Sequence, residues 1–164
     1  MGVPYIAIFI SVLALLYALV LVILIMKKSS GNPQMQKIAK AIQEGAMAYL
    51  NRQTRTIAIF TIIIFLLLAF VLPIPRGEHN NGMLMALGFI VGAAFSAIAG
   101  YIGMSVSVRA NVRTAEAART GLQEALSVAF RGGSVTGLAV VGLALMGVSG
   151  FYIIFTEYVG VSVG

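Results

Sequence analysis

The sequence predicts an all-α membrane protein, with four transmembrane helices and helical cytoplasmic extensions that form part of a larger helix bundle. Of its 164 residues, 60% are apolar and only 10% are charged, whereas a soluble domain has about 25% charged residues. Runs without Asp, Glu, Lys, Arg or His cover residues 3–26, 57–74, 83–104 and 132–156. Each is long enough for a helix to cross the hydrocarbon core of a bilayer.

The first run, residues 3–26, is expected to be a retained span. A cleaved signal peptide has its basic residues before a shorter apolar core, but here the basic pair Lys27 and Lys28 follows the run. Leu, Ile and Val dominate this segment, and it contains no ladder of glycines. We therefore expect a peripheral helix that faces lipid.

The second span, residues 57–74, is expected to belong to a longer helix that begins near residue 33. Asn32 is a suitable N-cap and Pro33 suits the first helical position, while Pro73 and Pro75 should end the helix. Apolar residues recur at helical spacing before the span and predict a stripe that packs against other cytoplasmic helix ends: Met35, Ile38, Ile42, Ala46 and Tyr49. An amphipathic helix lying on the membrane surface is the alternative.

Small residues recur along the third and fourth spans, 83–104 and 132–156. In membranes such residues let helix backbones approach closely, so both helices should be packed inside a bundle. The third span has a four-residue ladder, and the fourth has a looser series: Gly88, Gly92, Ser96 and Gly100, then Gly133, Gly137, Gly142, Gly147 and Gly150.

The segment between these spans, residues 105–121, also reads as helical, with Gly121 as its terminator. Four arginines fall in or just after it: Arg109, Arg113, Arg119 and Arg131. One interpretation is a solvated helical hairpin in which Glu116 forms ion pairs. The other is a phosphate-attracting patch at the mouth of a site, because arginine clusters commonly bind anions.

The distribution of basic residues predicts the orientation in the membrane. Residues 27–55 and 109–131 contain every Lys and Arg except Arg76, which lies in the short connection after the second span. Under the positive-inside rule the two basic segments are cytoplasmic and both chain ends are extracytoplasmic. Topology therefore accounts for the net charge of +6, and no nucleic-acid partner is expected.

The inventory of reactive residues argues against catalysis by this chain. It has no Cys and no Asp, five Glu and a single histidine, His79, so disulfides and thiolate metal sites are excluded and a Ser-His-Asp triad cannot form. Ion-coupled carriers place ionisable residues within their spans, and these four runs have none, which disfavours a small transporter. We expect no catalytic, cofactor-binding or metal-binding residue.

Three stretches are more specific than a generic membrane pattern. They start at Gly45, Ala99 and Ala125 and read GAMAYLNRQTRTI, AGYIGMSVSVRANVRTAEAAR and ALSVAFRGGSVTG. Together they resemble the N-terminal part of the membrane-integral, ion-pumping inorganic pyrophosphatases. The resemblance covers most of the chain from Met35 to about Gly150.

The resemblance implies a homodimeric pump that couples hydrolysis of Mg²⁺-pyrophosphate at the cytoplasmic side to outward transport of H⁺ or Na⁺, with K⁺ as a possible further requirement. The Asp-rich motifs of that family match no position here. Residues 1–164 are thus expected to form a single N-terminal transmembrane segment of a prokaryotic cell-membrane pump, inactive alone, with the catalytic helices absent. Its partners would be the bilayer and the remaining pump helices. The alternative is a free-standing four-helix membrane protein with a packing or interaction role and no enzymatic activity.

Overall fold

The computed structural model describes residues 2–70 and 81–158. Four long helices and a terminal π-helical turn follow one another along the chain: α1 (Val3–Met26), α2 (Pro33–Phe70), α3 (Asn81–Ala117), α4 (Leu122–Ile153) and η1 (Ile154–Tyr158). All four helices are long and apolar enough to cross a membrane, as the sequence predicts. Residues 71–80, with the expected helix stop at Pro73 and Pro75 and with Arg76 and His79, lie outside the described part.

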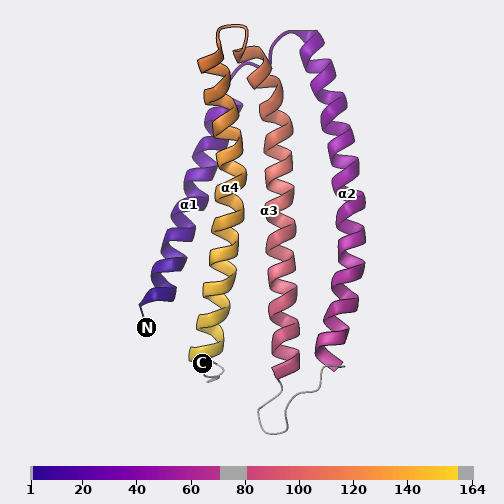
Figure 1. Cartoon of the computed structure of the whole chain (residues 1–164), viewed down its shortest axis with the longest axis vertical. Helices are drawn as coiled ribbons and strands as arrows, with labels where there is room; N and C mark the ends of the chain where they lie inside the picture. Colours follow the sequence, from indigo (N-terminus) through magenta and orange to yellow (C-terminus); the bar gives the residue numbers. More distant parts are fainter. Residues whose placement is uncertain (1, 71–80, 159–164) are drawn as a thin grey trace.

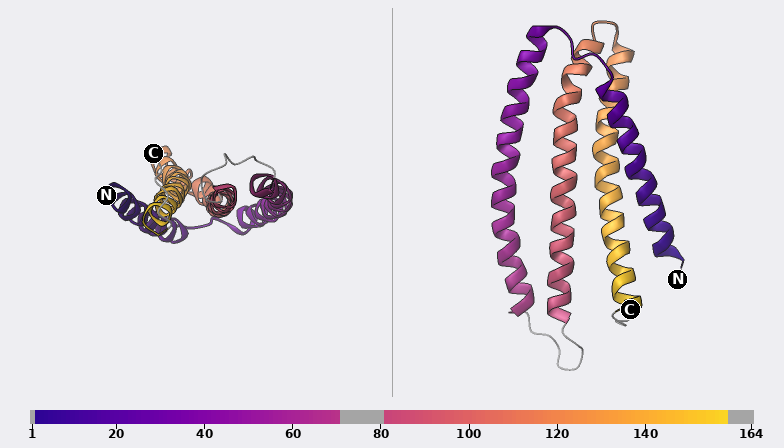
Figure 2. Two further views of the ribbon diagram at one scale, coloured as in Figure 1. Left: turned by 90° about the horizontal axis from the view of Figure 1, so that it is seen from below. Right: turned by 180° about the vertical axis from the view of Figure 1, so that it is seen from behind.

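The helices stand side by side in one curved row, in the order α1, α4, α3, α2 (Figures 1 and 2). The extensive contacts are those of α4 with α3, of α4 with α1, and of α3 with α2. The start of α1 and the end of α4 lie on the same side of the layer, at the lower ends of the helices in Figure 1. A single layer has two broad faces, so much of the apolar surface stays exposed within this chain.

Helix α1 has the same bounds as the first uncharged run and stands at the edge of the row. One side is buried: Ala18, Leu21 and Ile25 cluster with Val106 of α3 and Val135 of α4. Most of its other large apolar side chains are exposed. The helix is peripheral, as expected.

Helix α2 runs without a break from Pro33 through the expected start of the second span at residue 57. The backbone N–H of Met35 donates to the Asn32 Oδ1 at 2.9 Å, which confirms the N-cap because such a bond satisfies one of the orphan donors of the first turn.

The expected contact face of α2 is wrong in part. Ile38, Ile42 and Tyr49 are exposed, whereas Ala39 and Leu50, which lie next to them on the helix surface, are buried. Among the described elements, α2 packs against α3 alone, and this contact buries Ala39 and Leu50. The larger apolar stripe points away from this chain.

Helices α3 and α4 form the centre of the row, but their glycines play different parts from those expected. A Cβ on Gly88 would lie 2.6 Å from the Phe151 ring, and one on Gly147 would lie 2.7 Å from the Phe95 ring. These aromatic rings fill the space over glycines of the opposite helix. Here glycine makes room for a large side chain.

The rest of the ladder on α3 is open. A Cβ on Gly92 or Gly100 would meet nothing within 4 Å, and both residues are exposed together with Ser96. The expectation that this ladder packs within the bundle is therefore wrong for the helices of this chain. A partner for it would have to come from outside them.

The turn between α3 and α4 is shorter than expected. Helix α3 ends at Ala117, and Gly121 adopts φ +155° and ψ 161° as the N-cap of α4, a conformation that essentially only glycine tolerates. Gly121 serves both helices: its N–H donates to the Ala117 carbonyl at 3.2 Å at the end of α3, as expected of a terminator, and its carbonyl accepts from the Ala125 N–H at 3.2 Å at the start of α4. Arg119 forms the ion pair with Glu116 that the spacing indicated, at 3.2 Å.

Candidate functional site

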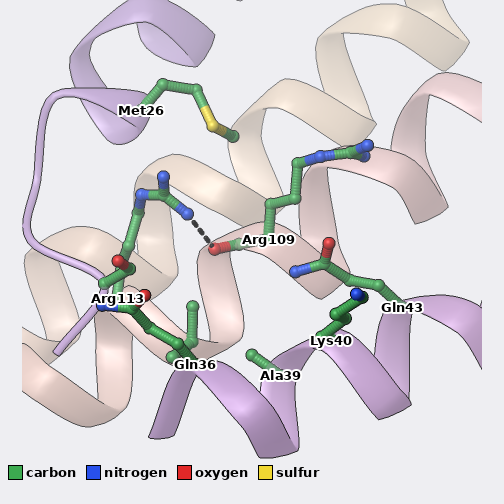
Figure 3. Close-up of a pocket in the computed structure, with 9 residues that line it drawn as sticks. Met26, Gln36, Ala39, Lys40, Gln43, Arg109 and Arg113 are labelled. Carbon is green, nitrogen blue, oxygen red and sulfur yellow. Dashed lines mark hydrogen bonds between the residues drawn. The ribbon is translucent and has the colours of Figure 1, made fainter. Parts of the chain in front are cut away.

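A basic pocket of about 310 Å³ lies at the ends of the helices away from the start of α1, at the top of Figure 1. It forms where the last residue of α1, the connection to α2, the first turns of α2 and the end of α3 meet (Figure 3). Nine residues line it: Met26, Ser30, Gln36, Ala39, Lys40, Gln43, Arg109, Val112 and Arg113.

Local hydrogen bonds hold the connection, residues 27–32, against α2. Gly31 has φ +79°, a left-handed conformation that favours glycine. Its N–H donates to the Ser29 Oγ at 3.1 Å, and its carbonyl accepts a bond from the Gln36 Nε2 at 2.8 Å. This side of the pocket therefore has a defined shape.

The far side of the connection is tied to α4. Lys28 forms an ion pair with Glu124 at 3.6 Å, which joins the end of α1 to the start of α4. Sequence reasoning missed this contact because Glu124 is distant in the chain. Neither residue lines the pocket.

Two arginines one turn apart on α3 shape the opposite wall. The Arg109 guanidinium donates to the Ser105 carbonyl at 2.7 Å, and the Arg113 guanidinium donates to the Arg109 carbonyl at 2.8 Å (Figure 3). The Arg113 Nε is buried and has no partner among the described residues. Each bond uses one of the five N–H donors of its guanidinium.

The electrostatics of the pocket are one-sided. Lys40, Arg109 and Arg113 contribute three cations, and the lining includes no carboxylate. Burial lowers the pKa of Arg113, which lies beyond the uncharged part of α3, and the positive charge of Arg109 lowers it further. Both effects mean that the positive charge is less favourable here than in water. A group that brings negative charge would relieve that cost.

The structure divides the four arginines of the expected patch. Arg109 and Arg113 face one pocket, Arg119 pairs with Glu116 outside it, and Arg131 on α4 is not among the lining residues. The sequence did not reveal that Lys40 would join the first two, because it comes from another helix. The helical periodicity of α2 was the available signal. The contact face was expected at the apolar stripe, which does not include Lys40.

A second pocket of about 510 Å³ lies between α2 and α3, within the membrane-spanning part of α3. Its lining is largely apolar, with Gln53 and Thr54 on one side and Ser96 and Gly100 of the open ladder on the other. Its place and lining suit a packing surface better than a reaction centre.

Among the residues that the structure describes, no group of three or more His, Cys, Asp or Glu side chains is placed to hold a metal ion. Mg²⁺ is held in proteins largely through carboxylates and phosphates. The donor set of the basic pocket, which consists of guanidinium, ammonium, amide and hydroxyl groups, does not fit such a cation.

Comparison with known proteins accounts for the specific motifs. Residues 12–163 match the family model described as inorganic H⁺ pyrophosphatase. A K⁺-insensitive pyrophosphate-energised proton pump of Methanosarcina mazei is 55% identical over 133 residues, which is 81% of this chain and 19% of the relative. A second K⁺-insensitive pyrophosphate-energised proton pump, of Moorella thermoacetica, is 51% identical over 144 residues, 88% of this chain and 20% of the relative.

The names of the relatives differ in the ion that is pumped and in the response to K⁺. A protein of Bacteroides thetaiotaomicron, 38% identical over 152 residues, bears the name of a K⁺-stimulated pyrophosphate-energised sodium pump. That match covers 91% of this chain and 20% of the relative. The chain therefore spans about one fifth of the length of these relatives, and over that stretch it belongs to the inorganic H⁺ pyrophosphatase family.

Proposed function

We propose that this chain supplies the N-terminal, four-helix membrane scaffold of a pyrophosphate-energised ion pump. The single observation that carries the proposal is the family match over residues 12–163 in a chain about one fifth as long as its relatives. The relatives named above pump H⁺ or Na⁺ by their names. Outward transport of one of these ions from a prokaryotic cytoplasm is the activity to which this segment would contribute.

Catalysis, in this proposal, comes from parts of the pump outside these 164 residues. The sequence contains no Asp, and the basic pocket does not offer the oxygen ligands that Mg²⁺ prefers. The site for Mg²⁺-pyrophosphate, and any K⁺ site, would belong to those other parts. No step of hydrolysis is assigned to a residue of this chain.

The exposed surfaces of the row support a scaffold that is completed by other helices. Among the described residues, the open ladder of Gly92, Ser96 and Gly100 and the apolar stripe of Ile38 and Ile42 are exposed, and Ser96 and Gly100 border the open pocket toward α2. Small residues of this kind are where membrane helices pack closely. We assign these surfaces to contacts with the remaining pump helices. Homodimer contacts are assigned to surfaces of the complete pump.

In the proposed orientation, the basic pocket and residues 27–56 and 105–131 lie on the cytoplasmic side. The charge distribution supports this, because ten of the eleven basic residues fall in these two segments. Both chain ends are then extracytoplasmic.

A complementation experiment tests the proposal. The M. mazei pump is expressed without the stretch that matches this chain, alone or together with the 164-residue chain, and pyrophosphate hydrolysis and proton uptake are measured in membrane vesicles. We expect activity only when both pieces are present. Hydrolysis by the 164-residue chain alone, abolished by EDTA, would contradict the scaffold role, and failure of the two pieces to complement would favour a free-standing membrane protein.

A pair of variants makes the same experiment specific for the contact surface. Gly92→Leu places a large side chain on the open ladder and should reduce the restored activity, because helices from the other piece could no longer approach closely. Val20→Leu, on an exposed part of α1, should leave it unchanged. Equal activity of the two variants would show that the ladder faces lipid.

A further inference from the structure

The basic pocket has properties that the scaffold role does not require. Packing alone is served by apolar and small residues, yet this pocket collects three cations from two helices around about 310 Å³ of space. That space equals the liquid volume of roughly ten water molecules. It is sufficient for a small polar group and the waters that solvate it.

The arginine pair concentrates positive charge at one wall of the pocket. Arg109 and Arg113 carry like charges on adjacent turns, and the Arg113 Nε is buried without a partner among the described residues. Arg109 is exposed and Arg113 is partly buried. Because like charges on adjacent turns repel each other, an anion bound at this wall stabilises the pair. Two of the carboxylates at this end of the helices are already engaged: Glu116 pairs with Arg119 and Glu124 pairs with Lys28. A third, Glu44, is exposed on α2 and does not line the pocket.

The kinds of donor that line the pocket suit a phosphate group. Guanidinium groups present several N–H donors in a fixed plane and bind phosphate oxygens in pairs, while Lys40 adds a point charge from the opposite wall (Figure 3). Gln36 and Gln43 contribute neutral amide groups to the lining. Three positive charges suit a group with more than one negative charge better than a single carboxylate.

The position of the pocket places it within reach of both the bilayer surface and the aqueous phase. Met26 lines it and is the last residue of the uncharged α1. Arg109 is the first charged residue after the uncharged part of α3, because residues 105–108 carry no charge either. Lipid phosphates lie at this level of a membrane, and soluble phosphates reach it from the cytoplasm.

We propose that this pocket, formed by Lys40, Arg109 and Arg113, binds a phosphate group. The group belongs either to the headgroup of an anionic lipid or to a free phosphate compound. Bound there, it neutralises the arginine pair and ties together the end of α1, the start of α2 and the end of α3. The site is separate from hydrolysis, so it does not depend on the activity proposed above.

The experiment uses the full 164-residue chain in nanodiscs, with thermal unfolding followed by far-UV circular dichroism. Phosphatidylcholine discs receive inorganic phosphate, pyrophosphate or, as a carboxylate probe, glutamate. Discs that contain phosphatidylglycerol form the lipid arm, in which native mass spectrometry counts the lipids that stay bound. We expect stabilisation in the lipid arm, in the free-phosphate arm or in both, and the responding arm identifies the source.

A matched pair of variants assigns the effect to the pocket. Arg113→Gln should weaken the phosphate effect about ten- to a hundredfold, as expected for loss of a hydrogen bond to a charged group. Arg119→Gln removes the same charge outside the pocket and should change it less than about threefold, as for an exposed pair.

The variants also differ without any ligand. In phosphatidylcholine discs free of phosphate, Arg113→Gln should unfold at a higher temperature than the natural chain, because the repulsion from Arg109 is gone. This readout separates loss of binding from loss of folding.

Three results would overturn the proposal. The first is that no phosphate source stabilises the chain. The second is that Arg113→Gln and Arg119→Gln weaken the effect equally, which would reflect general surface charge. The third is that glutamate stabilises as strongly as phosphate, which would make the pocket a socket for an acidic side chain of another segment.

Discussion

Gly142 is a point of close approach between α4 and α1, and its replacement by alanine tests the packing of these two helices. An added Cβ would lie 3.0 Å from the Cγ and Cδ2 of Leu15 and 3.3 Å from the backbone oxygen of Ser11. Carbon atoms in favourable contact are about 3.5 to 4.0 Å apart. Ser11 is fully buried, so the backbone of α1 has to shift as well as the Leu15 side chain.

The magnitude follows from two opposing terms. Overpacking of this kind costs about 1–3 kcal/mol, while alanine is a better helix former than glycine by about 1 kcal/mol. Gly137 is the matched control on the same helix, because a Cβ there would meet nothing within 4 Å. Gly137→Ala should show only the gain, and Gly142→Ala should be less stable than this control by about 1–3 kcal/mol.

The assay is unfolding by SDS titration in mixed micelles, followed by far-UV circular dichroism because the chain has no Trp. A second change serves as an internal check: Leu15→Ala should partly restore the stability of Gly142→Ala, since it removes the atoms that clash. If the two glycine variants unfold at the same point, α1 and α4 do not approach each other as described. Absence of any coupling between Leu15 and Gly142 would refute the steric explanation.

Three further predictions concern the ends of the helices. Asn32→Ala removes the N-cap of α2 and should cost about 1 kcal/mol, measured in the same titration; no change would mean that this cap is dispensable. Glu124→Gln breaks the ion pair with Lys28, and both side chains of this pair are about half exposed. The change should therefore lower the stability of the chain by less than about 1 kcal/mol at low salt and by less still at high salt. A larger, salt-independent loss would contradict that assignment. Because the chain lacks Cys, Ser29→Cys and Gly2→Cys can each be labelled singly in intact cells: an impermeant maleimide should reach position 2 and not position 29, and the reverse would invert the proposed orientation.

Much of the fold follows from local properties of the sequence. Runs without charge determine where helices cross a membrane, so α1 has the bounds of its run, and Asn32-Pro33 marks the start of α2 because capping needs only neighbouring residues. Arg119 and Glu116 pair because they lie three residues apart on adjacent turns. Such features depend on short stretches of chain.

Which face of a helix meets which neighbour could not be predicted in the same way. Periodicity identifies an apolar stripe such as Ile38 and Ile42, but it does not say whether the partner is α3, lipid or a part of the pump outside this chain. The basic pocket shows the same division: the four-residue spacing of Arg109 and Arg113 indicates a common face, whereas Lys40 joins them only through the packing of α2 on α3.

The order of the helices in the row has a consequence for how the chain assembles in the membrane. Helix α1 is made before the other three, but its main neighbour is α4, the fourth of them, while α2 and α3 can pair as soon as both are inserted. During synthesis α1 must therefore wait in lipid as a single helix, held close by the short connection of residues 27–32. Its many Leu, Ile and Val side chains suit that interval because they are as apolar as lipid, while the face of Ser11 and Ala18 stays available for α4.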